Sequence, residues 1–311
     1  SVRLLLIGFG RMGISHLSII SGLLLPKGLD VYVVDSSFAS RLLAKEMVPS
    51  VKVFKKLSDV TRDCAPKFFD FCLVTTPPIN RAELVSQAKL LAKTVFIEKP
   101  LMLRLEDGQM SGYVLQHAPL NVKVFEHLGK QDIISIKARL TTNISFEKVE
   151  KGWRSSKFGT VLYEFGGHLL TLISTTCGRP EFLSTAFDLT SVSCDANETD
   201  HVVLRFFSAG IDVVVELIAG STDVRKASYE IEFTTKDFIY TYDLYSLSSV
   251  SIIANGPSTT LLNLAAVDTN VPFYVRGFEF TSQMQAFLNG AHDILTVEQI
   301  DNIEKIIEGV E

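Results

Sequence analysis

A glycine-rich run near the start of the chain constrains its fold more than any other feature. Residues 8–13 read Gly-Phe-Gly-Arg-Met-Gly, directly after the apolar stretch Val2–Ile7 and at the opening of a helical pattern, Met12–Leu25. Such a run is common alone, but between a strand and a helix it is typical of a dinucleotide-binding βαβ unit. We expect such a unit here; a glycine turn with only a structural role is the alternative.

The glycines and an aspartate further along have separate expected roles. Gly8 allows a tight turn, Gly10 lets a diphosphate approach the helix N-terminus, and Gly13 lets the helix pack closely on the strand. Val31–Val34 ends at Asp35, whose carboxylate would accept hydrogen bonds from the adenosine ribose and repel a 2′-phosphate. We therefore expect NAD(H) in preference to NADP(H). The residues expected to bind it here are Gly8, Phe9, Gly10, Arg11, Met12, Gly13 and Asp35.

Short apolar runs alternate with helical patterns over residues 1–126. The expected strands are Val2–Ile7, Val31–Val34, Val51–Phe54, Phe71–Thr75, Thr94–Ile97 and Val122–Phe125. The expected helices are Met12–Leu25, Ser37–Met47, Arg81–Leu91 and Leu105–Leu115. This alternation predicts an α/β Rossmann domain with a doubly wound parallel sheet.

The pattern changes in residues 127–311, where strands follow one another across short polar turns. The expected strands are Ile133–Leu140, His201–Phe207, Val213–Ile218, Tyr229–Phe233, Phe238–Tyr242 and Val250–Ile253. Helical patterns cover Val161–Thr176, Arg276–Leu288 and Thr296–Glu308. We expect an α+β domain with a large, mainly antiparallel open sheet that binds substrate and forms oligomers, and the late helices to pack back on the Rossmann domain. Apolar residues at both parities of Val202–Phe207 predict that a second subunit covers the outer face of this sheet.

Composition narrows the class of protein. The chain has 311 residues, more than one typical domain of about 100–200. Its formal charge of −5 gives no basic surface, which argues against nucleic acid and anionic membranes as partners. No apolar run approaches the ~18 residues of a membrane span, and the first strand does not resemble a signal peptide. The four cysteines show no metal-ligand spacing, so we expect no metal and a reduced, cytoplasmic protein.

Two further motifs follow the glycine run in order. The stretch ending at Thr75 leads into Thr76-Pro77-Pro78, and the next strand leads into Glu98-Lys99-Pro100. Together with a later helix that contains Gly-Gly-His, this series resembles the glucose–fructose oxidoreductase/inositol dehydrogenase (GFO/IDH/MocA) family over nearly the whole chain.

The resemblance implies a role for the lysine turn. The peptide bond before Pro100 is typically cis in the family and points Lys99 into a cleft beside the nicotinamide, where the lysine orients the substrate hydroxyl and assists proton transfer. A lysine at the C-terminal edge of a parallel sheet also sits where ligands bind. Thr76, Pro77, Glu98 and Lys99 join the expected cofactor-binding residues. A surface lysine near a turn is the alternative.

The later helix supplies the other expected catalytic residues. Glu164 and His168 are four residues apart and share a helix face, so the carboxylate can fix the imidazole tautomer during proton removal. Gly166 and Gly167 weaken the helix, which suggests that something approaches its backbone closely. A histidine satisfied within an apolar core is the alternative reading of His168.

The chain departs from the family pattern at three positions. Relatives carry Asp-x-x-x-His-x-x-Asp at the helix, whereas Glu164 replaces the first Asp and Thr171 the second; Arg81 stands where many have His. These departures leave the substrate open. The connections at 126–132 and 155–159 are shorter than the resemblance implies, through deletion or through residues missing from the sequence. The remaining expected substrate contacts are His127, Trp153, Arg154 and Thr171.

These residues predict hydride transfer between NAD(H) and a secondary alcohol or ketone carbon of a sugar, sugar-nucleotide or cyclitol, with Lys99, His168 and Glu164 as catalytic residues. The resemblance also implies a homodimer or homotetramer formed through the C-terminal sheet. The alternatives are a non-catalytic NAD-binding regulator or scaffold of the same fold, and a biliverdin reductase-like reductase.

Overall fold

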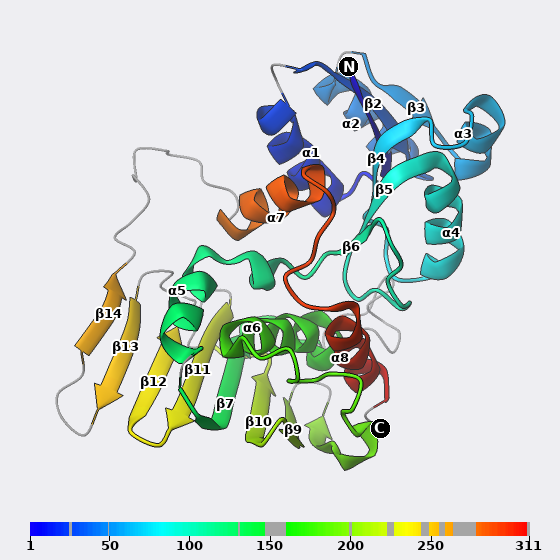
Figure 1. Ribbon diagram of the computed structural model, residues 1–311. Coiled ribbons are helices and arrows are strands. Elements are labelled where there is room, and N and C mark those ends of the chain that lie inside the picture. The colour runs from blue at the N-terminus through cyan, green and yellow to red at the C-terminus, as the bar shows by residue number, and fades with distance from the viewer. Residues whose placement is uncertain are drawn as a thin grey trace. The chain divides into compact units, whose positions relative to one another are not determined.

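The chain divides into two compact units in the computed structural model (Figure 1). The first comprises Ser1–His117 and Arg276–Asp293, and the second comprises Ala118–Val275 and Ile294–Glu311. The structure describes residues 1–24, 27–48, 50–129, 131–146, 160–198, 201–222, 227–243, 249–254, 259–263 and 278–309.

The first unit contains a six-stranded parallel sheet with the strand order β3-β2-β1-β4-β5-β6. Its strands are β1 (Val2–Ile7), β2 (Leu29–Val34), β3 (Lys52–Phe54), β4 (Phe69–Val74), β5 (Ala92–Ile97) and β6 (Gln109–Ser111). Its helices are α1 (Arg11–Leu24), α2 (Phe38–Met47), α3 (Leu57–Asp63), α4 (Arg81–Leu91), the 3₁₀ helix η2 (Val114–His117) and α7 (Phe278–Leu288). The expected doubly wound sheet is confirmed, and its order reverses between β1 and β4, where ligands bind in such sheets.

The middle strands of this sheet are covered on both faces. Leu4, Leu5 and Leu6 are adjacent in β1 and all three are fully buried, which explains why the strand is a continuous apolar run. On one face, Ile20 of α1 and Phe287 of α7 share a single hydrophobic cluster with Leu4 and Leu6. A helix from the far end of the chain therefore completes the core around the first helix.

The predicted strand Val122–Phe125 is wrong. These residues lie in helix α5 (Pro119–Leu128), which has Pro at its first position, where proline's fixed φ favours helix formation. Val124 and Leu128, one turn apart, are buried, whereas Phe125 is exposed. An apolar run this short fits a helix or a strand equally well. Since no parallel strand ends near residue 126, the short connection to residue 132 spans no crossover.

The predicted helix Leu105–Leu115 is also wrong. Its residues contain β6 and the first part of η2, and β6 pairs in parallel with β5. Gly108 has a φ of +76°, a left-handed conformation that does not fit within a regular right-handed helix. The last strand of the sheet therefore comes earlier in the sequence than expected.

The second unit is built on an eight-stranded sheet with the order β14-β13-β12-β11-β7-β10-β9-β8. Its strands are β7 (Ile133–Thr142), β8 (Ser193–Glu198), β9 (His201–Ser208), β10 (Ile211–Ile218), β11 (Ala227–Thr235), β12 (Phe238–Asp243), β13 (Ser249–Ala254) and β14 (Thr259–Asn263). Besides α5, its helical elements are the π-helical turn η4 (Leu162–Gly166), α6 (Gly167–Cys177), the 3₁₀ helix η5 (Leu189–Ser191) and α8 (Val297–Gly309). Among the described strands of this sheet, only β7 and β10 pair in parallel, so the expected mainly antiparallel sheet is confirmed.

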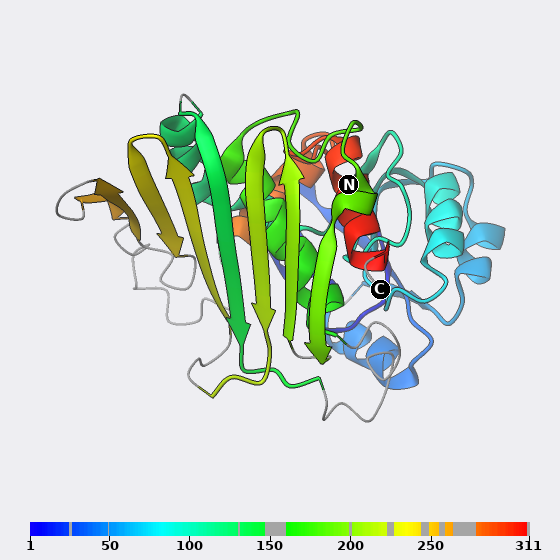
Figure 2. The same cartoon turned by 90° about the horizontal axis from the view of Figure 1, so that it is seen from below.

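The two faces of this sheet differ. Within the described part of the unit, the helices lie on one face of the sheet and leave the other face bare (Figure 2). Side chains of β9 alternate in burial, with Val202, Leu204 and Phe206 on the covered face. The bare face carries ion pairs between strands, among them Arg139 Nε–Glu216 Oε2 at 2.8 Å. The expectation that both faces are apolar is therefore only partly right, because charges share the outer face with apolar side chains.

His117, which is buried, and Asp293, which is partly buried, have pKa values shifted in opposite directions. Burial raises the pKa of Asp293 to about 6, although its carboxylate accepts hydrogen bonds from Ser111 Oγ and Gln116 Nε2, both at 2.7 Å. Burial lowers the pKa of His117 to about 4. Both side chains therefore resist becoming charged inside the unit.

These shifts predict opposing dependences of stability on pH. The folded state binds the Asp293 proton more tightly than the unfolded chain does. The contribution of Asp293 to the free energy of unfolding therefore falls by about 3 kcal/mol as the pH rises from about 4 to 6. His117 is protonated first in the unfolded chain, so its contribution falls by about 3 kcal/mol as the pH drops from about 6.5 to 4. Urea unfolding between pH 4 and 7 tests both shifts. In Asp293→Asn only the His117 effect remains, so the free energy of unfolding should fall more steeply as the pH drops. In His117→Leu only the Asp293 effect remains, so the free energy of unfolding should rise as the pH drops. Wild-type slopes in both variants would contradict the assignment.

Candidate active site

The glycine turn after β1 has the geometry that a diphosphate site needs. Gly8 has a φ of +95°, and a Cβ at Gly13 would lie 2.5 Å from the Gly8 carbonyl oxygen, so helix and turn touch backbone to backbone. A Cβ at Gly10 would meet nothing within 4 Å. This space opens at the start of α1, whose first turn has no acidic residue. The free N–H groups and the dipole of the helix therefore favour an anion here.

Asp35 lies beside the turn, directly after β2. Its carboxylate accepts hydrogen bonds from the backbone N–H of Phe9 at 2.7 Å and of Ser37 at 2.8 Å. The Arg41 guanidinium donates to the carbonyl oxygens of Asp35 and Ser36 at 2.7 and 2.9 Å. The acidic side chain is thus held in one orientation next to the glycine turn.

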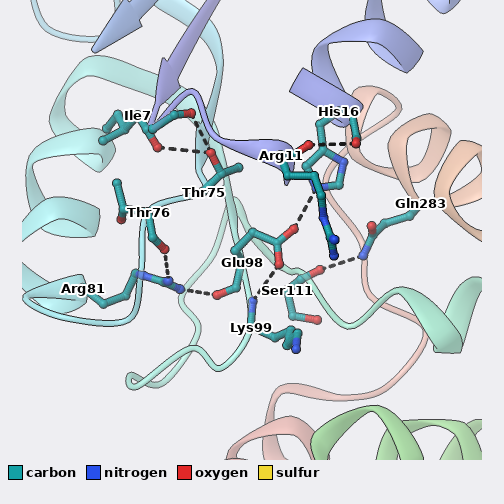
Figure 3. Close-up of polar contacts among 12 residues, drawn as sticks. Ile7, Arg11, His16, Thr75, Thr76, Arg81, Glu98, Lys99, Ser111 and Gln283 are labelled. Carbon is teal, nitrogen blue, oxygen red and sulfur yellow. Dashed lines mark hydrogen bonds and ion pairs between the residues drawn. The ribbon is translucent and has the colours of Figure 1, made fainter. Parts of the chain in front are cut away.

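The loop after β4 connects the glycine turn to the next strand. Thr75 donates its backbone N–H to Ile7 O at 2.9 Å and its hydroxyl to Gly8 O at 2.8 Å. Thr76 then leaves the sheet, and its backbone N lies 3.0 Å from where a Cβ at Gly8 would sit. The loop of Thr75 and Thr76 and the glycine turn therefore pack against each other, at the point where the strand order reverses (Figure 3).

The lysine turn follows β5 at the same edge of the sheet. The Lys99–Pro100 peptide bond is cis, as the resemblance implies. Both carboxylate oxygens of Glu98 are engaged: Oε1 lies 2.7 Å from His16 Nε2, and Oε2 accepts the backbone N–H of Lys99 at 3.2 Å. Glu98 is buried, and these two contacts fix its carboxylate between helix α1 and the backbone of the turn.

Arg81 has a role that the sequence did not suggest. Its side chain is only 2% exposed, and its guanidinium donates to the carbonyl oxygens of Thr76, Glu98 and Pro100. In Figure 3 it reaches from the base of α4 across to the lysine turn. Arg81 therefore links the Thr-Pro-Pro loop to the lysine turn. Its observed contacts stabilise the backbone of the site.

Glu164 and His168 belong to the second unit. Glu164 lies in the π-helical turn η4, and His168 is the second residue of α6, which continues it. A π-turn takes more residues per turn than an α-helix, so residues four apart are nearly in line, and such turns are frequent at functional sites. Both side chains are partly exposed. The expected pairing of this carboxylate and imidazole on one face is compatible with this backbone.

Gly166, at the end of the π-helical turn, has a packing role. A Cβ at Gly166 would lie 2.8 Å from a Leu162 methyl carbon and 3.5 Å from one of Leu217 in β10. Leucine side chains of the turn and of the sheet therefore make the close approach at Gly166, where the sequence suggested an unspecified neighbour. Tyr163, next in the turn, faces α8: burial and the nearby charges of Glu308 and Glu304 raise its pKa.

The remaining expected contacts are placed as follows. Thr171 is fully buried, and its hydroxyl donates to His168 O at 3.0 Å, within its own helix. His127 lies in α5. Trp153 and Arg154 lie outside the described residues. Lys99 belongs to the first unit and His168 to the second.

The described residues contain neither a cluster of metal-ligand side chains nor a helix that could span a membrane. No group of three or more histidine, cysteine, aspartate or glutamate side chains there is arranged to hold a metal ion. None of the described helices combines the length and the apolar character that crossing a bilayer requires.

Solved structures share the fold over the whole chain. An oxidoreductase domain protein from Kribbella flavida is 16% identical with a TM-score of 0.74, and the match covers 100% of this chain and 96% of that one. Levoglucosan dehydrogenase, in complex with NADH and levoglucosan, is 14% identical with a TM-score of 0.76 over 99% and 96% of the two chains. UDP-N-acetylglucosamine 3-dehydrogenase GnnA from Acidithiobacillus ferrooxidans is 15% identical with a TM-score of 0.65 over 99% and 95%.

Sequence comparison identifies the first unit. A comparison with curated protein sequences found no match. Residues 2–124 match the GFO_IDH_MocA model, described as the oxidoreductase family with an NAD-binding Rossmann fold. The match includes the glycine turn, Asp35, the Thr-Pro-Pro loop and the lysine turn. Residues 2–124 are therefore similar to the NAD-binding Rossmann domain of the GFO/IDH/MocA oxidoreductase family.

Proposed function

We propose that this protein is a dehydrogenase that prefers NAD(H) and acts on a secondary alcohol carbon of a sugar, sugar-nucleotide or cyclitol, or on the corresponding ketone. One observation carries the proposal: Lys99 follows β5 at the edge of the sheet where the glycine turn after β1 also lies. A cationic side chain at this edge is suited to a substrate oxygen placed next to a bound dinucleotide.

Lys99, His168 and Glu164 have separate roles in the proposed reaction. Bound NAD⁺ supplies the hydride acceptor. Lys99 donates a hydrogen bond to the substrate oxygen, and His168 accepts the hydroxyl proton at a ring nitrogen. Glu164 orients the imidazole and stabilises its protonated form. Acid–base assistance of this kind contributes roughly 10²–10⁴-fold to the rate.

The printed names of similar structures support the substrate class. Levoglucosan dehydrogenase was solved with levoglucosan, and GnnA acts on UDP-N-acetylglucosamine. Both names specify dehydrogenases of sugars or sugar nucleotides, and the cofactor in the first complex is NADH.

The proposal is tested by screening NADH formation from NAD⁺ against sugars, sugar acids, nucleotide sugars and inositols. At least one compound should be oxidised, and Lys99→Ala, purified in the same way, should lose that activity. If NADH binds but no member of the panel is oxidised or, as its ketone, reduced, a non-catalytic NAD-binding protein becomes the better description.

The cofactor preference is a separate prediction from Asp35. Its fixed carboxylate would repel a 2′-phosphate, and like charges in contact cost several kcal/mol, so NADH should bind at least about tenfold more tightly than NADPH. Fluorescence titration of both nucleotides measures this ratio. Asp35→Asn removes the charge with little change in shape and should narrow the ratio. If the wild type binds NADPH as tightly as NADH, the predicted role of Asp35 in cofactor preference is wrong.

We also expect a homodimer or homotetramer formed through the bare face of the second unit's sheet. Phe207 points to this face and is 62% exposed, and the same face carries the partly buried apolar side chains of Val203 and Val214. Light scattering at micromolar concentration should show an oligomer, and Phe207→Lys should weaken it. Phe38→Lys is the matched control, because Phe38 is 73% exposed on α2 of the other unit. A monomeric wild type would contradict the expectation.

A further inference from the structure

A buried histidine–carboxylate pair joins the first helix to the lysine turn. His16 of α1 has no exposed surface, and its Nε2 lies 2.7 Å from Glu98 Oε1. The Phe96 ring meets the imidazole edge-on, with ring centroids 4.9 Å apart. The pair is therefore shielded from water, where a charge-assisted hydrogen bond is strong and its loss is costly.

The hydrogen bonds define the direction of this contact. His16 Nδ1 is buried and has no hydrogen-bond partner among the described residues. A proton on Nδ1 would lack an acceptor, so the ring carries its proton on Nε2 and donates it to Glu98. The other Glu98 oxygen accepts the backbone N–H of Lys99 at 3.2 Å. One carboxylate therefore bridges helix α1 and the backbone of Lys99.

The turn around Lys99 has little freedom to move. A Cβ at Gly112 would lie 2.8 Å from Glu98 Cα and 2.9 Å from Lys99 N, so the neighbouring strand end presses on the turn. Arg81 binds the carbonyl oxygens on both sides of Lys99. The Glu98 carboxylate adds a third restraint by accepting the backbone N–H of Lys99. Through its contact with His16, this carboxylate also connects the turn to α1.

We infer that His16 is a positioning residue for Lys99, acting through Glu98 to tie the lysine turn to the helix whose N-terminus receives the dinucleotide. The inference rests on the proposed function, since it needs Lys99 beside the nicotinamide. It explains why a polar side chain occupies the buried face of α1, between Gly13 and Leu17.

Three substitutions separate the parts of this bridge. His16→Met removes the donor at similar volume, whereas His16→Gln keeps an amide N–H near the position of Nε2. Glu98→Gln keeps the shape, but its amide has only one oxygen, so it cannot accept from both His16 and Lys99. Thermal unfolding and NADH titration should show folded His16 variants with nearly unchanged NADH affinity, because His16 lies outside the glycine turn.

Lysine acylation tests the position of Lys99 without a known substrate. The rate at which N-acetoxysuccinimide acetylates Lys99 is measured by peptide mass spectrometry relative to Lys93, whose side chain is 60% exposed in the same unit. Saturating NADH should protect Lys99 in the wild type and in His16→Gln. Most of that protection should be lost in His16→Met and Glu98→Gln.

Turnover provides the second readout. With a substrate from the screen, kcat of His16→Met should fall by about 100-fold, the effect of misplacing a reacting group by about 1 Å. His16→Gln should recover most of this loss, and KM for NAD⁺ should change little in either variant. A structural defect alone would lower the unfolding temperature and NADH affinity together.

The outcomes are distinguishable. Equal protection and equal kcat in the wild type and His16→Met would overturn the inference and leave the proposed function intact. Absence of NADH protection in the wild type would show that Lys99 does not lie beside the nicotinamide, and both would fall. If His16→Met does not fold, Glu98→Gln decides, with wild-type protection counting against the inference.

Discussion

Lys99→Ala and His168→Ala should each reduce kcat by about 10²–10⁴-fold, the usual contribution of a positioned acid–base group. NADH affinity should remain nearly unchanged, because neither side chain belongs to the glycine turn or to Asp35, which would hold the diphosphate and the adenosine ribose. Steady-state kinetics on a substrate from the screen and fluorescence titration of NADH measure the two effects separately.

Thr171→Val provides the matched control for the helix. Thr171 is buried and its hydroxyl bonds to the His168 carbonyl within α6, so its loss should cost little activity. Near-wild-type turnover in both alanine variants would show that the catalytic assignment is wrong. A large loss in Thr171→Val would instead indicate that its hydroxyl leaves the helix to bind substrate.

Arg81→Met should lower the free energy of unfolding by about 3–5 kcal/mol, the usual cost of removing one partner from a buried charged network. The carbonyl oxygens of Thr76, Glu98 and Pro100 lose a charged donor at the same time, and each buried acceptor left unsatisfied costs about 1–3 kcal/mol. Urea unfolding of the isolated variant measures this loss.

Arg62→Met is the control for that measurement. Arg62 is 70% exposed and pairs with acidic neighbours on its own helix, so its loss should change stability by less than about 0.5 kcal/mol. Arg81→Lys should recover only part of the stability, because an ammonium lacks the planar fork that reaches several carbonyls. A loss below about 1 kcal/mol in Arg81→Met would mean that water replaces the guanidinium.

Local signals were sufficient for the parts of the site that depend on the backbone. Gly8 needs a positive φ, and Gly13 needs the space that a side chain would fill, so the glycine turn is encoded in consecutive residues. Asp35 directly follows β2, and the Lys99–Pro100 turn comes one residue after β5; the apolar runs of both strands are visible because the sheet buries both of their faces.

The prediction of helix or strand was wrong where an apolar run was too short to show the period of either one. Val122–Phe125 is apolar enough for a strand, yet it forms part of α5 because Pro119 begins a helix and packing buries Val124 and Leu128 one turn apart. The last strand of the first sheet has only the three residues Gln109–Ser111, too few to show any period.

By itself, the sequence determined the order of strands and helices in most of the first unit, the glycine turn and the positions of Asp35 and Lys99, because each depends on neighbours within a few residues. The tertiary structure alone decided what holds these residues in place. His16 meets Glu98 82 residues further along the chain, and Ser111 binds Asp293 across 182 residues. Arg81 reads in sequence as a helix start, and only folding brings the carbonyls of two loops within reach of its guanidinium. No local period encodes such contacts, since their stabilisation comes from desolvated charges that meet only when the sheet has formed.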